Sequence, residues 1–103
     1  MFATVALGLS LCSTAASAKV RDGNQLLQQC TATIGAQMAF CFSYIDAVTD
    51  SLLANGDVCI SREVDDTQLR NIVLQLLQTN PGLRRLSAPS LIARALAEAF
   101  PCR

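Results

Sequence analysis

Apolar residues recur at helical spacing along most of the chain beyond residue 23. Because successive residues of a helix rotate by about 100°, apolar positions three and four apart gather on one face. This period predicts helices at residues 24–33, 37–55, 66 or 67 to 79, and from about 87 to 100. No alternating strand pattern of useful length occurs. We therefore expect an all-α fold, a small bundle of about four short helices.

Turn and capping residues separate the expected helices. Asn24 and Ser87 belong to the residue types that cap helix N-termini. Asn55-Gly56 is a C-terminal stop, since Gly tolerates the left-handed conformation there. Asn80-Pro81-Gly82 ends the third helix and Pro101 ends the fourth, because Pro cannot continue a helix.

Each expected helix has one apolar face that we assign to the core. In the second helix Ser43, Asp46 and Asp50 fall opposite this face, so we expect them in solvent. Leu74 falls outside the apolar face of the third helix, which makes it a candidate contact residue. The apolar faces consist of Leu26, Leu27 and Cys30; Phe40, Cys41, Tyr44, Ile45, Val48 and Leu52; Leu69, Ile72, Val73, Leu76 and Leu77; and Ile92, Ala95, Leu96, Ala99 and Phe100.

The first 18 residues have the pattern of a signal peptide. The apolar run from Phe2 to Leu11 is far shorter than the ~20 residues that a membrane-spanning helix needs. Ala16-Ser17-Ala18 follows, and it fits the small-x-small rule of signal peptidase sites. No Lys or Arg precedes the run, and a lipoprotein signal at Cys12 is the alternative. We expect a signal peptide at 1–18, one mature domain at 19–103, and a periplasmic location.

Removal of the leader leaves four cysteines, Cys30, Cys41, Cys59 and Cys102. Four cysteines in a short exported chain predict two disulfides, whereas a metal site would need a close Cys pair or histidines. If consecutive helices pack antiparallel, Cys30 lies near Cys41 and Cys59 lies near Cys102. The alternative pairing is Cys30–Cys59 with Cys41–Cys102. The sequence leaves the choice between these pairings open.

Charge and composition exclude several classes of function. The chain has 8 basic residues, 8 acidic residues and no histidine. A neutral chain without a basic stripe is not expected to bind nucleic acid, and no later apolar run could insert into a bilayer. Without histidine, neither a Ser-His-Asp nor a Cys-His arrangement can form, and no glycine-rich phosphate loop occurs. We expect no enzymatic activity, no cofactor and no bound metal.

Two groups of carboxylates remain as candidates for chemistry. Asp46 and Asp50 are one turn apart, a spacing suited to acid–base chemistry or a cation, but their face lies opposite the apolar one. Glu63, Asp65 and Asp66 could form a patch for a basic partner. Acidic residues are also favoured at the start of a helix, where the dipole is positive. The simpler interpretation, solvated surface charge, is preferred for both groups.

Several short motifs occur in a recognisable order along the chain. Residues 40–44, Phe-Cys-Phe-Ser-Tyr, resemble a Phe-Cys-x-Gly-Tyr motif, and Cys59-Ile60-Ser61 resembles Cys-x-Pro. Gln68, the apolar pairs Ile72-Val73 and Leu76-Leu77, and Asn80-Pro81 resemble the third helix of the same family pattern and the His-Pro-type ending of that helix. Residues 95–102, Ala-Leu-Ala-Glu-Ala-Phe-Pro-Cys, are the most distinctive match. Together these motifs resemble the Tai-like family of immunity proteins of type VI secretion.

The resemblance implies a function as well as a fold. Tai-like proteins protect bacteria against peptidoglycan amidase toxins, so it implies an amidase effector as the protein partner and a homodimer as the working form. The alternative is a small periplasmic chaperone or stress protein, which would also be helical and disulfide-bonded. Chaperones of this type unfold at low pH, when their acidic side chains and histidines are protonated. This chain has 8 acidic residues and no histidine, and the immunity function is therefore preferred.

The connection between the third and fourth helices, residues 79–87, together with the adjoining third helix, is the expected inhibitory surface. The alternative is a solvated turn whose leucines pack on the core. Loops on a rigid scaffold often carry recognition, and the resemblance implies the same general region. The loop presents Asn80, Arg84 and Arg85, and Arg is enriched at binding hot spots because its planar fork makes paired hydrogen bonds. With Leu74, these residues form the predicted partner-binding set.

Overall fold

The computed structural model describes residues 20–103 and contains four α-helices in that range. They are α1 (Gly23–Cys30), α2 (Gly35–Ala54), α3 (Asp66–Thr79) and α4 (Ala88–Ala99), with a short 3-10 helix, η2 (Pro81–Leu83), between the last two. The expected all-α fold with two disulfides is confirmed. The predicted signal peptide at 1–18 lies outside the described residues. No helix within 20–103 is long and apolar enough to cross a membrane.

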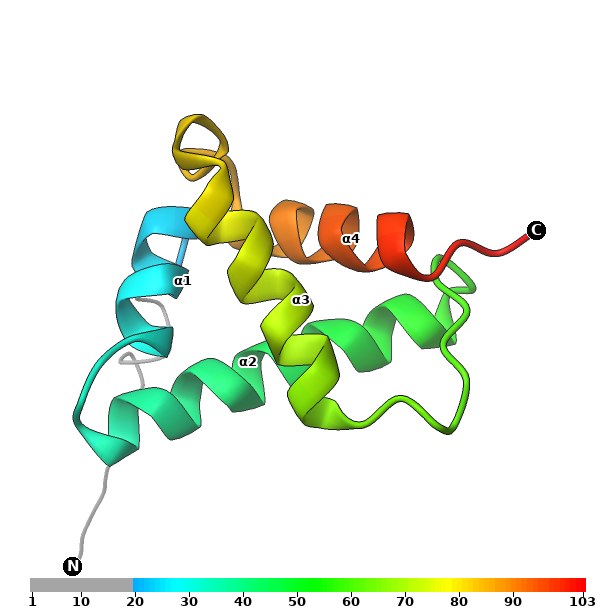
Figure 1. Ribbon diagram of the computed structural model, residues 1–103, viewed down its shortest axis with the longest axis horizontal. Coiled ribbons are helices and arrows are strands. Elements are labelled where there is room, and N and C mark those ends of the chain that lie inside the picture. The colour runs from blue at the N-terminus through cyan, green and yellow to red at the C-terminus, as the bar shows by residue number, and fades with distance from the viewer. Residues whose placement is uncertain (1–19) are drawn as a thin grey trace, which may run out of the picture.

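The helices pack around a single core. Figure 1 shows α3 crossing in front of α2, α4 near the C-terminal half of α2, and α1 on the left of the view. The two helices of the α3–α4 pair diverge from the connection that joins them, and the C-terminus lies at the far end from that connection. Every helix contributes side chains that are completely or almost completely buried, namely Leu26, Cys41, Ile45, Val73, Leu77, Leu91, Ile92 and Leu96.

The N-terminal caps explain where three of the helices begin. Asp22, and not Asn24 as predicted, caps α1: its Oδ1 accepts a hydrogen bond from the Gln25 backbone N–H at 2.9 Å. Ser87 caps α4 as predicted, accepting from the Ser90 N–H. Asp and Asn can both cap a helix, so Asp22 and Asn24, two positions apart, left the first residue of α1 ambiguous in the sequence.

The connection between α2 and α3 is ordered by local hydrogen bonds. Gly56 has a φ of 76° and follows the C-cap of α2, where its N–H donates to the Leu53 carbonyl. The N–H of Asp57 donates to the Leu52 carbonyl, which completes a Schellman motif. At the other end Asp65 and Gln68 form a reciprocal capping box at the start of α3. The predicted stop at Gly56 is confirmed.

Two disulfides join different elements of the fold. Cys30 at the end of α1 is bonded to Cys41 on α2, and Cys59 is bonded to Cys102 beyond α4. The first bond lies in the core, whereas Cys59 and Cys102 are exposed. Of the two pairings that the sequence left open, this is the one that antiparallel packing of neighbouring helices favours.

Burial departs from the predicted faces at several positions. Leu91 is buried although it was not assigned to the core, and Ala99 is exposed although it was. Leu74 is half-buried and packs against the core. Asp46 is not fully in solvent, because its carboxylate faces Arg70 of α3. Which side of a helix is covered depends on how its neighbours cross it, and the residues of that helix alone do not specify the crossing.

Candidate partner-binding surface

The connection between α3 and α4 is attached to the start of α1 by backbone hydrogen bonds. The N–H of Gly23 donates to the Leu86 carbonyl at 3.1 Å, and the N–H of Asn24 donates to the Arg84 carbonyl at 3.0 Å. The N–H of Ala88 donates to the Arg21 carbonyl at 2.9 Å. These bonds form a short antiparallel contact between residues 21–24 and 84–88. The second half of the loop is therefore held against the start of α1.

The loop also has a fixed internal conformation. Pro81 begins η2, and the N–H groups of Leu83, Arg84 and Leu86 each donate to a carbonyl three residues earlier. Leu83 is half-buried and packs against the core, while Leu86 is 39% exposed. A loop with satisfied backbone groups loses little conformational entropy when a partner binds it. This preorganisation suits a binding surface.

Three of the four predicted contact residues lie in this loop, in different environments. Asn80 is half-buried, and its amide donates to the Leu76 carbonyl at 2.9 Å, so it ends α3. Arg84 is half-buried, and its Nε is buried without a hydrogen-bond partner. Arg85 is exposed, and its Nη1 donates to the Gly82 carbonyl at 2.9 Å. Leu74 lies six residues before Asn80, about 9 Å along the helix axis.

Arg21 joins this surface although the sequence analysis did not include it. Its side chain is exposed, and its carbonyl accepts the N–H of Ala88 at the start of α4. Residues 21 and 84 are separated by more than sixty positions, and no periodicity relates them. Only the packing of α1 against α3 and α4 brings Arg21 to the loop.

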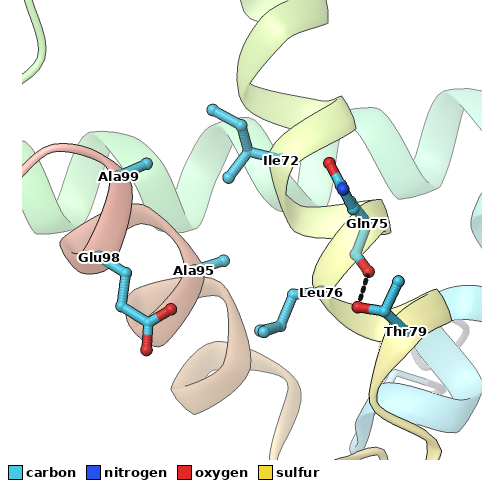
Figure 2. A pocket seen from close by; sticks show the side chains of 7 residues that line it. All are labelled: Ile72, Gln75, Leu76, Thr79, Ala95, Glu98 and Ala99. Atoms are coloured by element: carbon cyan, nitrogen blue, oxygen red, sulfur yellow. Dashed lines mark hydrogen bonds between the residues drawn. The ribbon is translucent and has the colours of Figure 1, made fainter.

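A shallow groove runs between α3 and α4 (Figure 2). Its volume is about 330 Å³. The side chains of Ile72 and Leu76 point into it from α3, and Ala95 and Ala99 form the α4 side. Polar side chains complete the lining, namely Gln75, Thr79 and Glu98.

Asp46 and Asp50 do not form a common site. Asp46 Oδ2 lies 3.0 Å from Arg70 Nη2, and the Arg70 guanidinium stacks over the Phe42 ring with Cζ 4.4 Å from its centroid. Asp50 is exposed. Asp46 therefore connects α2 to α3. Between residues 20 and 103 there is no group of three His, Cys, Asp or Glu side chains placed to hold a metal ion.

The acidic residues before α3 have separate local roles. Asp65 accepts a hydrogen bond from the Gln68 N–H, and Asp66 lies in the first turn of α3. A hydrogen bond from Ser61 lowers the pKa of the Glu63 carboxyl, and Glu63 is exposed. Their positions agree with the interpretation of Asp65 and Asp66 as charges that favour a helix start.

Comparison with known proteins identifies one family. The Rap1a immunity proteins match residues 22–102 of the chain, a range that covers all four helices and both disulfides. No curated protein and no solved structure matches the chain.

Proposed function

Because the chain belongs to the Rap1a immunity protein family, a family of type VI secretion, we propose that it is a periplasmic inhibitor of a peptidoglycan amidase effector. The family match over residues 22–102 carries this proposal. An immunity protein acts by binding a toxin protein, so its essential property is a surface and not a set of catalytic groups. Under this proposal the cell that delivers the effector is itself protected from it.

We place the inhibitory surface on the loop from Asn80 to Ser87. The loop projects at one end of the bundle, away from the C-terminus (Figure 1). Its backbone is held by α1, and Arg85 and Leu86 extend from it into solvent. A projecting, preorganised segment with one cation and one apolar side chain fits the entrance of an enzyme cleft. Binding there would block access of the peptidoglycan substrate.

The amidase target and the location derive from the Tai-like motifs and the predicted signal peptide. Peptidoglycan lies outside the cytoplasmic membrane, so an inhibitor of an enzyme that cleaves it has to be exported. Disulfides form and persist in that oxidising compartment, and the two bonds Cys30–Cys41 and Cys59–Cys102 agree with export. The same resemblance supports a homodimer. Light scattering of the purified mature chain tests this, because a homodimer has twice the mass of one chain.

The proposed function is tested by protection of cells. An amidase effector from the same genome is directed to the periplasm, with or without this chain carrying its own leader. We expect cells that express the chain to grow. We also expect the purified effector to lose activity against peptidoglycan when the purified chain is added. If none of the encoded amidase effectors is inhibited or bound, the amidase proposal is wrong.

The position of the surface is tested with variants of the same chain. Arg85→Ala and Leu86→Ala should weaken effector binding, each by ~1 kcal/mol or more, if they lie at the centre of the interface. Arg62→Ala is the matched control, because Arg62 is exposed and lies in the connection between α2 and α3. Thermal melting confirms that each variant is folded. Unchanged affinity of both loop variants would exclude this loop.

A further inference from the structure

Three arginines belong to the two segments that meet where the α3–α4 loop is hydrogen-bonded to the start of α1. Arg84 and Arg85 belong to the loop, and the hydrogen bond from Ala88 to the Arg21 carbonyl places Arg21 beside it. We call Arg21, Arg84 and Arg85 the basic end. The nearest acidic residue in the chain, Asp22, directs its Oδ1 to the Gln25 N–H as the cap of α1.

No carboxylate forms an ion pair with the basic end. Within residues 20–103 the ion pairs are Arg70–Asp46 and Arg94–Glu98, both elsewhere in the bundle. Arg85 donates to a backbone carbonyl, and the Nε of Arg84 is buried without a hydrogen-bond partner.

The opposite end of α3 is acidic. Asp57, Glu63, Asp65 and Asp66 lie in the α2–α3 connection and at the start of α3, and all are exposed. Arg62 and Arg103 lie in the same region and offset part of this charge. The 14 residues of α3 separate the two ends by about 20 Å, roughly two Debye lengths at physiological salt. The chain is neutral as a whole, but its charges are separated along the molecule.

We infer that the basic end docks on an acidic surface of the partner protein, and that the charge separation orients the approach. This inference rests on the proposed function, since it concerns the same loop, and it adds the chemistry of the partner's surface. Carboxylates accept paired hydrogen bonds from the planar guanidinium group. A neutral protein with separated charges is not attracted as a whole, but it is turned so that its basic end leads.

The test is the salt dependence of association with the amidase effectors of the same genome. Charged groups at an interface rim act mainly on the association rate and on its response to salt. The double charge reversal Arg21→Glu with Arg85→Glu retains the backbone hydrogen bonds of the loop. We expect it to slow association by ~10-fold or more at low ionic strength, with the difference shrinking as salt rises.

Arg62→Glu and Arg94→Glu together are the matched control. They make the same change in net charge away from the basic end, and both residues are exposed. We expect this control to change the association rate by less than about threefold. Equal slowing of the two double variants would show that net charge and not the basic end matters, and it would overturn the inference.

A second measurement does not depend on the effector. An acidic peptide of Asp and Glu is titrated into the isotope-labelled chain at low salt, and backbone amide shifts are recorded. We expect the shifts to concentrate in residues 21–24 and 82–88 and to be lost in the Arg21→Glu, Arg85→Glu variant. Shifts spread evenly or located elsewhere would overturn the inference. If the shifts are localised but the chain binds no amidase effector, the proposed amidase target is rejected. The inference that the basic end binds an acidic protein surface is then retained.

Discussion

A Cβ atom added to Gly23 would lie 2.5 Å from Cδ1 of Leu91. It would also lie 2.9 Å from the Arg84 Cα and 3.0 Å from the Arg84 carbonyl oxygen. The end of the Leu91 side chain can shift, but the Arg84 atoms belong to the backbone. The first residue of α1 therefore has to be Gly for the α3–α4 loop to approach this closely. The position of the proposed binding surface depends on this contact.

Gly23→Ala should destabilise the protein and displace the loop. We expect a loss of ~1 to 3 kcal/mol in the free energy of unfolding, the usual range for overpacking. Gly82→Ala is the matched control. Gly82 lies in the α3–α4 loop itself, and a Cβ added there meets nothing within 4 Å. Urea unfolding measures both variants. If the two substitutions have equal effects, the close approach at Gly23 is not a constraint.

The ion pair between Arg70 and Asp46 should stabilise the crossing of α2 and α3 only modestly. Their side chains are 22% and 34% exposed, so solvent screens the pair. A double-mutant cycle with Arg70→Ala and Asp46→Ala should give a coupling free energy of ~0.5 to 1 kcal/mol. Arg70→Lys retains the charge and should lose part of the stacking on Phe42. Additive effects of the two Ala substitutions would contradict a direct interaction.

The two disulfides should differ in their accessibility to reductant. Cys59 and Cys102 are exposed, whereas Cys30 and Cys41 are 4% and 0% exposed. Mild reduction of the folded protein, followed by alkylation and peptide mass analysis, should label Cys59 and Cys102 first. The unfolded protein provides the control, since both bonds are then accessible. Labelling of Cys30 and Cys41 at the same rate in the folded protein would be contrary to this expectation.

Removal of either disulfide should lower the free energy of unfolding, and the longer loop should matter more. The Cys59–Cys102 bond closes a sequence separation of 43, and the Cys30–Cys41 bond closes one of 11. In the chain-entropy model these correspond to ~4 and ~3 kcal/mol. Replacing each pair by Ser, with urea unfolding as the measurement, compares the two. A larger loss for the buried Cys30–Cys41 pair would show that packing outweighs loop closure.

Stability should fall in alkaline solution because of Tyr44. Partial burial raises the pKa of the Tyr44 phenol above its model-compound value of 10.0. The unfolded chain then releases this proton at lower pH than the folded protein, so ionisation favours unfolding as the pH rises above about 10. Tyr44→Phe should remove this contribution. The chain has one tyrosine, so tyrosinate absorbance reports the titration of this residue alone; a midpoint below 10 in the folded protein would refute the prediction.

The α3–α4 connection illustrates the limit of prediction from sequence. Its turn residues and its two arginines were recognised, and Ser87 was correctly assigned as the cap of α4. The contribution of Arg21 was missed, because it depends on hydrogen bonds between segments about sixty residues apart. The assignment of Asn80 to the end of α3 is confirmed, and its side-chain amide donates to the Leu76 carbonyl of that helix.

What the sequence determined by itself was the set of local structures. Apolar spacing, caps and stop residues are properties of neighbouring positions, and they were sufficient for four helices. The number of cysteines predicted two disulfides but left their pairing open. The tertiary structure decided which flank of each helix is covered, and so it placed Leu91 in the core, Asp46 beside Arg70 and Arg21 beside the loop. The physical reason is that a helix presents a continuous surface around its axis, and its own residues do not specify the angle at which a neighbour crosses it.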